Sequence, residues 1–259
     1  MAETATREGD LAVAPVDARP DGAPAEGAER PYLAFDVFVD WGVRALATTR
    51  AAGSFSTVGD EPIQAVMARW AALQAHCHPG GGGRFATARQ VHGAEVIVHG
   101  PGWQGWLRGH EADGHLAMAR GTALAVSVAD CVPVYVAHPS GAIAMLHSGW
   151  RSTAANILAV AVRRLADAGH VPGDLRVLLG PSICGRCYEV SPDVYARLTG
   201  RPVDRPTAVS LHSVIAGQAR ALGVRDVHAT DLCTRCDNDR LFSHRAGDAG
   251  RMLGVLVAD

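Results

Sequence analysis

Apolar residues occur in short runs along the middle of the chain, separated by small or polar breaks. The runs over 122–131, 132–137 and 142–146 are apolar at most positions, which is typical of strands that are covered on both faces. Shorter runs rich in Val, Leu, Phe and Ala predict further strands. These cover 33–39, 43–49, 85–91, 95–98, 175–179, 224–228 and 252–257.

Helical spacing of apolar residues occurs in other segments. It predicts a helix over 61–75, and Ser152 or Thr153 is suited to cap another that runs to about residue 168. Shorter helices are expected over 192–198 and 209–222. Because helices and strands do not alternate strictly, we expect an α/β or layered α+β fold. It would form a single domain over 31–259, with central mixed β-sheets flanked by helices.

The first 30 residues differ in composition from the rest. They hold seven acidic residues against three Arg and contain no aromatic residue, which predicts a disordered acidic tail over 1–30. They lack the basic start and apolar core of a signal peptide, and no stretch of the chain approaches the ~18 apolar residues that span a bilayer. We therefore expect a cytoplasmic protein without membrane contact, whose six Cys are reduced.

The 259-residue chain carries 24 basic and 26 acidic residues, for a formal net charge of −2, and every basic residue is Arg. The absence of Lys excludes Walker P-loops, pyridoxal enzymes and Schiff-base aldolases, which all need a Lys amine. The near-neutral balance argues against nucleic-acid binding, which is typical of strongly basic domains. Any anion that binds here must be held by Arg, His, backbone amides or a metal ion.

Three predicted strands end in a residue that binds soft metal ions, and a tight turn follows each of them. These residues are His92, Cys131 and His147. Two imidazoles and one thiolate suit Zn²⁺ and leave its fourth position for water or substrate, as in catalytic zinc sites. Asp113 and Asp130 are available as the accompanying carboxylates, as in nucleobase deaminases. The spacing of the ligands matches no short zinc motif, so other roles for each residue stay open at this level.

Several blocks of sequence together resemble one family. In their order they are similar to the YfiH-type proteins, first described as laccase-domain or multicopper polyphenol oxidases and later interpreted as zinc-dependent purine nucleoside phosphorylases. The resemblance covers the chain from about residue 35 to its end. The blocks are 48–50 with 53–54, 58–60, 90–93, 112–114, 129–133, 147–151, 179–183 with 187–190, and 242–245 with 250–252.

The resemblance implies that His92, Cys131 and His147 are the zinc ligands and catalytic residues of a surface pocket. It implies phosphorolysis of adenosine, inosine or methylthioadenosine to the base and a sugar 1-phosphate, with adenosine deamination as a side activity. The partners would be nucleoside and phosphate, and the protein a monomer or small homo-oligomer. The residues expected to contact phosphate or substrate are Arg50, Ser54, Gln90, Asp113, Arg245 and Arg251.

The chain departs from the family pattern at three places. Ala68, Ser152 and His244 stand where the family usually has Asn, Gly and Tyr. None of these belongs to the predicted metal ligands, so the differences bear on the choice of substrate. The segment 100–109 is rich in Gly and is expected to be a loop, whose two tryptophans either line the pocket or pack against the core.

A hydrolase is one alternative function. Family members are also known as peptidoglycan editing factors, and Cys131 beside a His would then be the nucleophile of a hydrolase.

Copper is the cofactor that the laccase label implies, but we disfavour it. His76 and His78 form the only His-x-His pair of the chain, and Gly82 stands where a further His would be wanted.

Four further cysteines form two Cys-x-x-Cys pairs. Cys184 and Cys187 make the first, and Cys233 and Cys236 the second. Such pairs can form a structural zinc site, although their separation is longer than in a usual zinc ribbon. The sequence leaves open a structural zinc, a disulfide or redox pair, and free packed thiols. A zinc-binding interaction module without catalysis is therefore the non-enzyme alternative.

Overall fold

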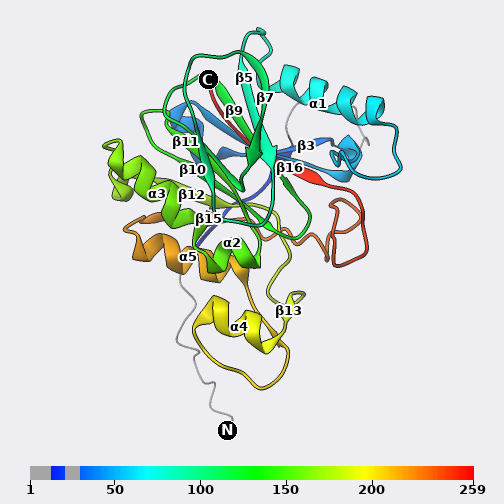
Figure 1. Ribbon diagram of the computed structural model, residues 1–259, viewed down its shortest axis with the longest axis vertical. Helices are drawn as coiled ribbons and strands as arrows, with labels where there is room; N and C mark the ends of the chain where they lie inside the picture. Colours follow the sequence, from blue (N-terminus) through cyan, green and yellow to red (C-terminus); the bar gives the residue numbers. More distant parts are fainter. Residues whose placement is uncertain (1–12, 21–29) are drawn as a thin grey trace.

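Two β-sheets lie at the centre of the computed structural model, which describes residues 13–20 and 30–259 (Figure 1). The first sheet has the order β1-β15-β12-β10-β11-β8-β6. Its strands are β1 (Ala14–Pro15), β6 (Val96–His99), β8 (Gly114–Ala117), β10 (Val132–Ala137), β11 (Ile143–Ser148), β12 (Arg176–Leu179) and β15 (Asp226–Ala229). The second sheet has the order β2-β3-β4-β16-β9-β5-β7. Its strands are β2 (Arg19–Pro20), β3 (Tyr32–Phe35), β4 (Val43–Thr48), β5 (Arg84–Arg89), β7 (Gly105–Glu111), β9 (Thr122–Val128) and β16 (Met252–Ala258).

The two sheets pack face to face. Tyr135 and Met145 of the first sheet share a buried cluster with Val126 and Leu256 of the second, and every residue of β10, β11 and β16 is buried. The hydroxyl of Tyr135 donates a hydrogen bond of 2.8 Å to the carbonyl oxygen of Leu46 and so links the sheets. These strands are apolar along most of their length, as is typical of strands covered on both faces.

Helices cover the outer face of each sheet (Figure 1). α2 (Trp150–Ala154), α3 (Ile157–Asp167) and α5 (Leu211–Ala221) lie against the first sheet, and α1 (Ile63–Cys77) lies against the second. α4 (Pro192–Thr199) packs against α2, farther from the sheets (Figure 1). The shorter elements are η1 (Asp36–Trp41), η2 (Arg50–Ala52), η3 (Pro172–Asp174), β13 (Glu189–Val190) and β14 (Thr207–Ala208). Within the described residues, no helix has the length and apolarity to cross a membrane. The predicted single-domain α/β fold with mixed sheets and flanking helices is confirmed.

The strand expected over 33–39 ends early. β3 stops at Phe35, and the chain enters the 3-10 helix η1, which ends at Gly42 with left-handed backbone (φ 63°). Phe38 of this helix is fully buried in the cluster between the sheets, and Asp40 forms an ion pair of 2.8 Å with Arg176. The prediction was wrong here because these long-range contacts outweigh the local preference for a strand.

The helix expected over 152–168 is divided in two at Asn156. This residue has left-handed backbone (φ 54°), and its side-chain oxygen accepts a hydrogen bond of 3.1 Å from the backbone N–H of Ala159. Asn is among the residues that tolerate this conformation and cap helices. The segment 100–109 is likewise not only a loop, because its second half enters β7, parallel to β5.

Part of the expected disordered tail is paired with the sheets. β1 runs parallel to β15, and β2 runs antiparallel to β3. The backbone N–H of Val16 also donates a hydrogen bond of 2.9 Å to the carbonyl oxygen of Ala229. For 13–20 the structure thus differs from the expectation, because exposed sheet edges offer backbone partners to a passing segment. The remainder of the expected tail, 1–12 and 21–29, lies outside the described residues.

Gly254 of β16 lies in close contact with the first sheet and provides a test of this packing. A Cβ atom added there would lie 2.7 Å from Cβ of Pro133 and 3.0 Å from the hydroxyl of Tyr135. We therefore expect Gly254→Ala to lower the free energy of unfolding by about 1–3 kcal/mol, the usual cost of overpacking a core. Urea unfolding measures this. Gly80→Ala is the matched control, because a Cβ there meets nothing within 4 Å; an equal loss in both variants would contradict the packing.

Candidate functional site

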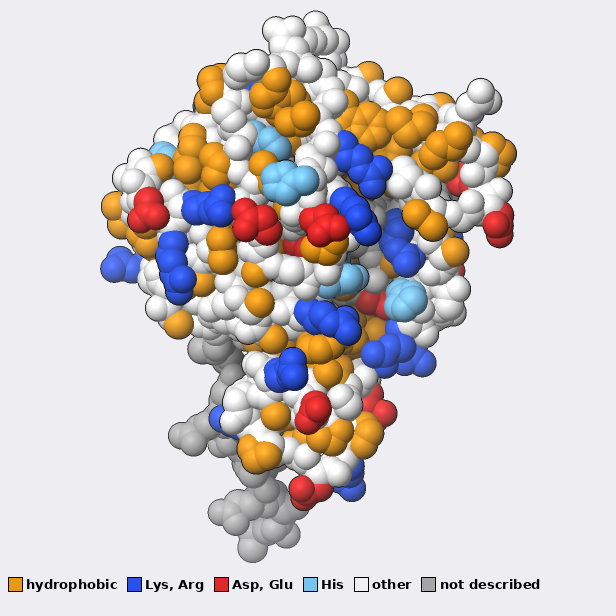
Figure 2. Space-filling model, in the orientation of Figure 1, with side chains coloured by type: hydrophobic (Ala, Val, Ile, Leu, Met, Phe, Trp, Pro, Cys, Tyr) orange, Lys and Arg blue, Asp and Glu red, His pale blue; other side chains and the backbone are white. Residues whose placement is uncertain are grey.

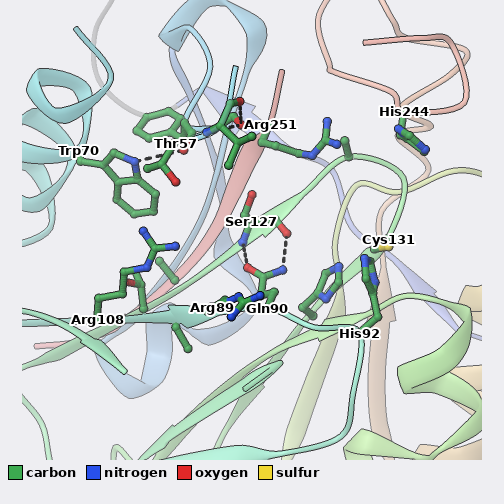
Figure 3. A pocket seen from close by; sticks show the side chains of 18 of the residues that line it. Thr57, Trp70, Arg89, Gln90, His92, Arg108, Ser127, Cys131, His244 and Arg251 are labelled. Carbon is green, nitrogen blue, oxygen red and sulfur yellow. Dashed lines mark hydrogen bonds between the residues drawn. The ribbon is translucent and has the colours of Figure 1, made fainter. Parts of the chain in front are cut away.

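The three predicted metal ligands converge where the chain passes between the sheets. His92 lies on the connection from β5 to β6, and Cys131 lies on the connection from β9 to β10; both connections lead from the second sheet to the first. His147 lies in β11. One nitrogen or sulfur atom of each residue lies within 4.8 Å of the others. Figure 3 shows His92 and Cys131 side by side at one end of a pocket.

A third connection of this kind, from β7 to β8, carries the buried carboxylate of Asp113. This carboxylate accepts hydrogen bonds from the backbone N–H groups of Val91, His92 and Gly93, at 3.1, 2.9 and 2.7 Å. It also accepts a hydrogen bond of 2.8 Å from Nδ1 of the His147 ring. Burial alone would raise the pKa of Asp113, but these hydrogen bonds outweigh it and lower the pKa. One carboxylate therefore positions both imidazole ligands.

Asp130 shapes the turn that presents Cys131. Its backbone is left-handed (φ 82°), an uncommon conformation for a residue with a side chain. Its carboxylate accepts hydrogen bonds from the hydroxyls of Thr234 (2.6 Å) and Ser243 (2.7 Å) and from the backbone N–H of Arg245 (2.7 Å). The sequence analysis expected Asp130 to be one of two carboxylates that accompany the predicted metal ligands. In the structure its hydrogen bonds fix the turn that precedes Cys131.

The thiol of Cys131 and the imidazole of His147 shift each other's pKa. Burial alone would raise the pKa of Cys131, but the charge of His147 and hydrogen bonds from His147 and His92 lower it to about 6. Burial alone would lower the pKa of His147, but the Cys131 thiolate and the hydrogen bond to Asp113 raise it to about 9. In the metal-free protein the pair is therefore a thiolate beside an imidazolium at neutral pH.

The arrangement of these side chains fits a zinc ion. The carboxylate of Asp113 fixes Nδ1 of His147, which leaves Nε2 as the ligand atom; metal-binding histidines are usually held in this way. A Cβ at Gly149 would lie 2.7 Å from Sγ of Cys131 and 3.3 Å from Nδ1 of His92. Only glycine leaves this space free beside the ligands. Two nitrogens and one sulfur, with a fourth side open to a pocket, are the donor set of a catalytic zinc site.

The three predicted metal ligands lie in the wall of a cavity of about 590 Å³. Figure 3 shows Trp70 and Arg108 at the end opposite His92, with Gln90 and Ser127 between them. In Figure 2, Arg and His side chains gather around a hollow on this face. No Asp or Glu is among the described residues that line the cavity. The Arg, His, Phe and Trp residues that line the cavity are Phe55, Trp70, Arg89, His92, Trp106, Arg108, His147, His244 and Arg251.

Two of the predicted phosphate or substrate residues line this cavity, Gln90 and Arg251. The amide of Gln90 is bonded to the backbone of Ser127 in both directions, at 2.8 and 2.6 Å, so it joins β9 to the His92 loop. One nitrogen of the Arg251 guanidinium, Nη1, donates to backbone carbonyls, at 2.7 Å to that of Gly250. Ser54 supports Arg251 from behind, because its hydroxyl accepts the backbone N–H of Arg251 at 3.2 Å.

Arg50, Ser54, Asp113 and Arg245 do not line the cavity. The guanidinium of Arg50 forms an ion pair of 2.7 Å with Asp248 and lies 4.3 Å over the ring of Phe242. Arg245 donates to the carbonyl oxygen of Glu189 at 3.0 Å. These guanidinium groups hold the loop over 240–250 in place, because each has partners within the protein.

Two cavity arginines, Arg89 and Arg108, were missed by the sequence analysis. Arg108 lies in β7, opposite Thr87 of β5, and its segment was expected to be a glycine-rich loop. Arg89 forms an ion pair of 2.9 Å with Glu111. Side chains alternate along a strand, so Trp106 and Arg108, two residues apart, lie on the same face of β7 and both line the cavity. A strand assignment for this segment would have predicted that, but its glycines suggested a loop.

Comparison with known proteins identifies the family of this chain. The chain belongs to the family described as multi-copper polyphenol oxidoreductase laccase, which matches residues 48–259. It is 34% identical over 189 residues to a purine nucleoside phosphorylase of Streptomyces coelicolor, covering 68% of this chain and 76% of that protein. It is 31% identical over 232 residues to one of Corynebacterium glutamicum, covering 83% and 94%.

Solved structures show the same fold. YlmD of Geobacillus stearothermophilus superposes with a TM-score of 0.79 at 26% identity, covering 91% of this chain and 98% of that chain. The hypothetical protein YfiH of Bacillus licheniformis superposes with a TM-score of 0.77 at 23% identity, covering 90% and 98%. The resemblance to the YfiH-type proteins is thereby confirmed.

The coupling between Cys131 and His147 can be measured in metal-free protein. We expect the rate of Cys131 alkylation by iodoacetamide to rise with pH around a midpoint near 6, because the thiolate is the reacting form. Asp113→Asn removes a negative charge that keeps His147 protonated, so the midpoint should move upward. Mass spectrometry of the Cys131 peptide measures the rate. Asp193→Asn, an exposed carboxylate on α4, should leave the midpoint unchanged; a wild-type midpoint near that of an ordinary thiol would refute the coupling.

Proposed function

We propose that this protein catalyses the phosphorolysis of purine nucleosides at the cavity that contains His92, Cys131 and His147. The observation that carries this is the composition of the wall, which combines a metal-ligand set, three Arg and an aromatic end without a carboxylate. Such a wall suits an anion together with a flat aromatic ring. Relatives that are 31–35% identical carry the name purine nucleoside phosphorylase, which supports the same reaction.

Phosphate would be held by arginine. The guanidinium of Arg108 has no hydrogen bond or ion pair with any other residue that the structure describes, so it is free to bind an anion. Arg251 retains donors besides Nη1, whereas Arg89 is already paired with Glu111. Because the chain has no Lys, the planar, permanently charged guanidinium is the cationic side chain that remains for binding phosphate oxygens in pairs.

The aromatic end of the cavity would hold the purine. Trp106 is half-buried and stacks on Trp70 with ring centroids 4.9 Å apart. Phe55 packs edge-on against Trp70 at 5.5 Å, so the tryptophans are fixed before substrate arrives. A rigid aromatic surface loses little conformational entropy when a ring binds to it. The sugar would then lie between this end and the metal ligands.

Zinc is the metal that we propose for His92, Cys131 and His147. When bound, zinc supplies Lewis-acid stabilisation of the negative charge that develops at the reacting atoms. Asp113 keeps the proton of His147 on Nδ1 and so leaves Nε2 available as a ligand. The family description names copper, but a multicopper centre needs several adjacent histidine clusters. Among the described residues, the groups of three or more possible ligands are this one and a group of four cysteines.

Adenosine deamination would be a side activity of the phosphorylase, with the same metal ligands and water in place of phosphate. Two other functions are kept as alternatives to be tested. A peptidoglycan-precursor hydrolase would use the Cys131 thiolate as nucleophile. A zinc-binding interaction module would bind metal without turnover. The low pKa of Cys131 suits a nucleophile as well as a ligand, so product analysis has to separate these functions.

Incubation of the pure zinc-loaded protein with adenosine, inosine and methylthioadenosine tests the proposal. We expect release of the free base and a sugar 1-phosphate only when phosphate is present, and loss of turnover in Cys131→Ala. Chromatography with mass spectrometry identifies the products, and conversion of adenosine to inosine without phosphate would reveal deamination. Release of base without phosphate, or no turnover of the three nucleosides, would overturn the phosphorylase proposal.

Arg108→Gln tests the phosphate contact. Loss of a charge-assisted hydrogen bond costs about 1.5–3 kcal/mol, so we expect the KM for phosphate to rise about 10-fold to 100-fold, while the KM for the nucleoside changes less. Steady-state kinetics with phosphate as the varied substrate measures this. Arg163→Gln on α3, exposed and away from the cavity, is the matched control. An unchanged KM for phosphate in Arg108→Gln would exclude Arg108 from the phosphate site.

A further inference from the structure

The two Cys-x-x-Cys pairs, 46 residues apart from Cys187 to Cys233, come together in the fold. One sulfur atom of each of Cys184, Cys187, Cys233 and Cys236 lies within 4.8 Å of the others. The cluster is formed by the connection from β12 to β13 and by the segment after β15. Neither segment contributes a ligand to the His92, Cys131 and His147 set, so this is a separate group of metal-binding side chains.

The geometry of the sulfur atoms matches a tetrahedral site. Sγ of Cys187 lies 3.5 Å from Sγ of Cys236. With zinc–sulfur bonds of about 2.3 Å, the sulfur atoms of a tetrahedral site are about 3.8 Å apart. A disulfide would need about 2.05 Å. Four sulfur donors without an open position are the donor set of a structural zinc site rather than a catalytic one.

Backbone N–H groups from both segments point at one of the sulfur atoms. Sγ of Cys233 accepts hydrogen bonds from the backbone N–H groups of Cys184 (3.3 Å) and Cys236 (3.4 Å). The backbone N–H of Cys187 donates to the carbonyl oxygen of Cys184 at 3.0 Å and closes the turn of the first pair. Amide groups that point at a sulfur atom stabilise its thiolate, which is the metal-binding form of cysteine.

Each pair also carries an Arg as its third residue. Arg186 precedes Cys187, and Arg235 precedes Cys236. Four thiolates around one Zn²⁺ keep a net charge of about −2, so an Arg within each pair lowers the electrostatic cost of bringing the thiolates together. Nη1 of Arg235 donates to the carbonyl oxygen of Cys187 at 3.4 Å and so joins the second pair to the first.

We propose that Cys184, Cys187, Cys233 and Cys236 bind a second zinc ion, which has a structural role. Binding transfers the thiol protons to solvent and leaves every sulfur in its original oxidation state. No oxidant is therefore needed, in contrast to a disulfide. The proposal does not depend on the reaction at the other site.

This second zinc would fix the turn that presents Cys131. Cys233 and Ser182 form an isolated parallel β-bridge, and the backbone N–H of Thr234 donates to the carbonyl oxygen of Ser182 at 3.1 Å. The hydroxyl of Thr234 in turn donates to the carboxylate of Asp130 at 2.6 Å. The cysteine cluster is thus one hydrogen-bonded residue away from the Asp130–Cys131 turn, which gives a structural metal a defined place in the site.

Counting zinc per chain tests the proposal. We expect two zinc ions per chain in protein purified with reductant and zinc, measured by plasma mass spectrometry and by native mass spectrometry. The double variant Cys187→Ser/Cys236→Ser should lose one zinc and keep the other. Cys131→Ala should also lose one and keep the sulfur site. Cys77→Ala is the matched control, because Cys77 belongs to neither group, and it should keep both.

Cobalt substitution identifies which site is lost. A site with four thiolates gives a stronger sulfur-to-cobalt charge-transfer absorption than a site with one, so the double variant should lose most of this absorption and Cys131→Ala should lose little. One zinc per chain in both the wild type and the double variant would overturn the proposal. So would wild-type protein with one zinc and a mass lowered by disulfide formation. If the double variant does not fold, the charge-transfer absorption of cobalt-loaded Cys131→Ala decides the question, because only the four-cysteine site remains in that variant. This readout is independent of nucleoside turnover.

Discussion

The site depends on the hydrogen bonds that the buried carboxylate of Asp113 accepts. A buried charge is stable only when hydrogen-bonded or paired, and this one is satisfied by three backbone N–H groups of the His92 loop and by the ring of His147. The same bonds hold His92 in left-handed backbone (φ 58°), a conformation that costs about 1–3 kcal/mol when a side chain is present. The hydrogen bonds that stabilise this one buried carboxylate therefore also fix the positions of His92 and His147, two of the predicted metal ligands.

The stacking of two sheets explains why these ligands meet. Three connections lead from the second sheet to the first, and each supplies one residue: His92, Asp113 and Cys131. Because stacked sheets lie about 10 Å apart, short connections between them bring their side chains into one small volume. A rigid core behind them, with Tyr135 bonded across to Leu46, keeps that volume constant. The site is therefore a consequence of the layer arrangement.

Charge is divided between the two sides of the site. Behind the ligands, Asp113 and Asp130 are enclosed by hydrogen bonds, whereas the cavity in front is lined by Arg and His without a carboxylate among the described lining residues. An anion in the cavity thus meets positive charge, and the negative charges that position the ligands are screened from it by their partners. The proposed metal cation and the proposed phosphate would thus be bound by different groups on the two sides of the site, without any Lys.

The sequence by itself determined the layered fold, the His92, Cys131 and His147 set and the exclusion of Lys chemistry, because apolar runs and ligand types are local properties. Only the tertiary structure decided which arginines face the cavity. Nothing in the sequence distinguishes Arg50 from Arg108 as a phosphate-binding residue. In the structure, Arg50 pairs with Asp248, whereas Arg108 lines the cavity from β7, a strand that its glycines had made look like a loop. The four cysteines likewise became one cluster only after folding, because 46 residues of sheet and helix separate the two pairs. Contacts between distant segments assign such roles, and no local pattern contains them.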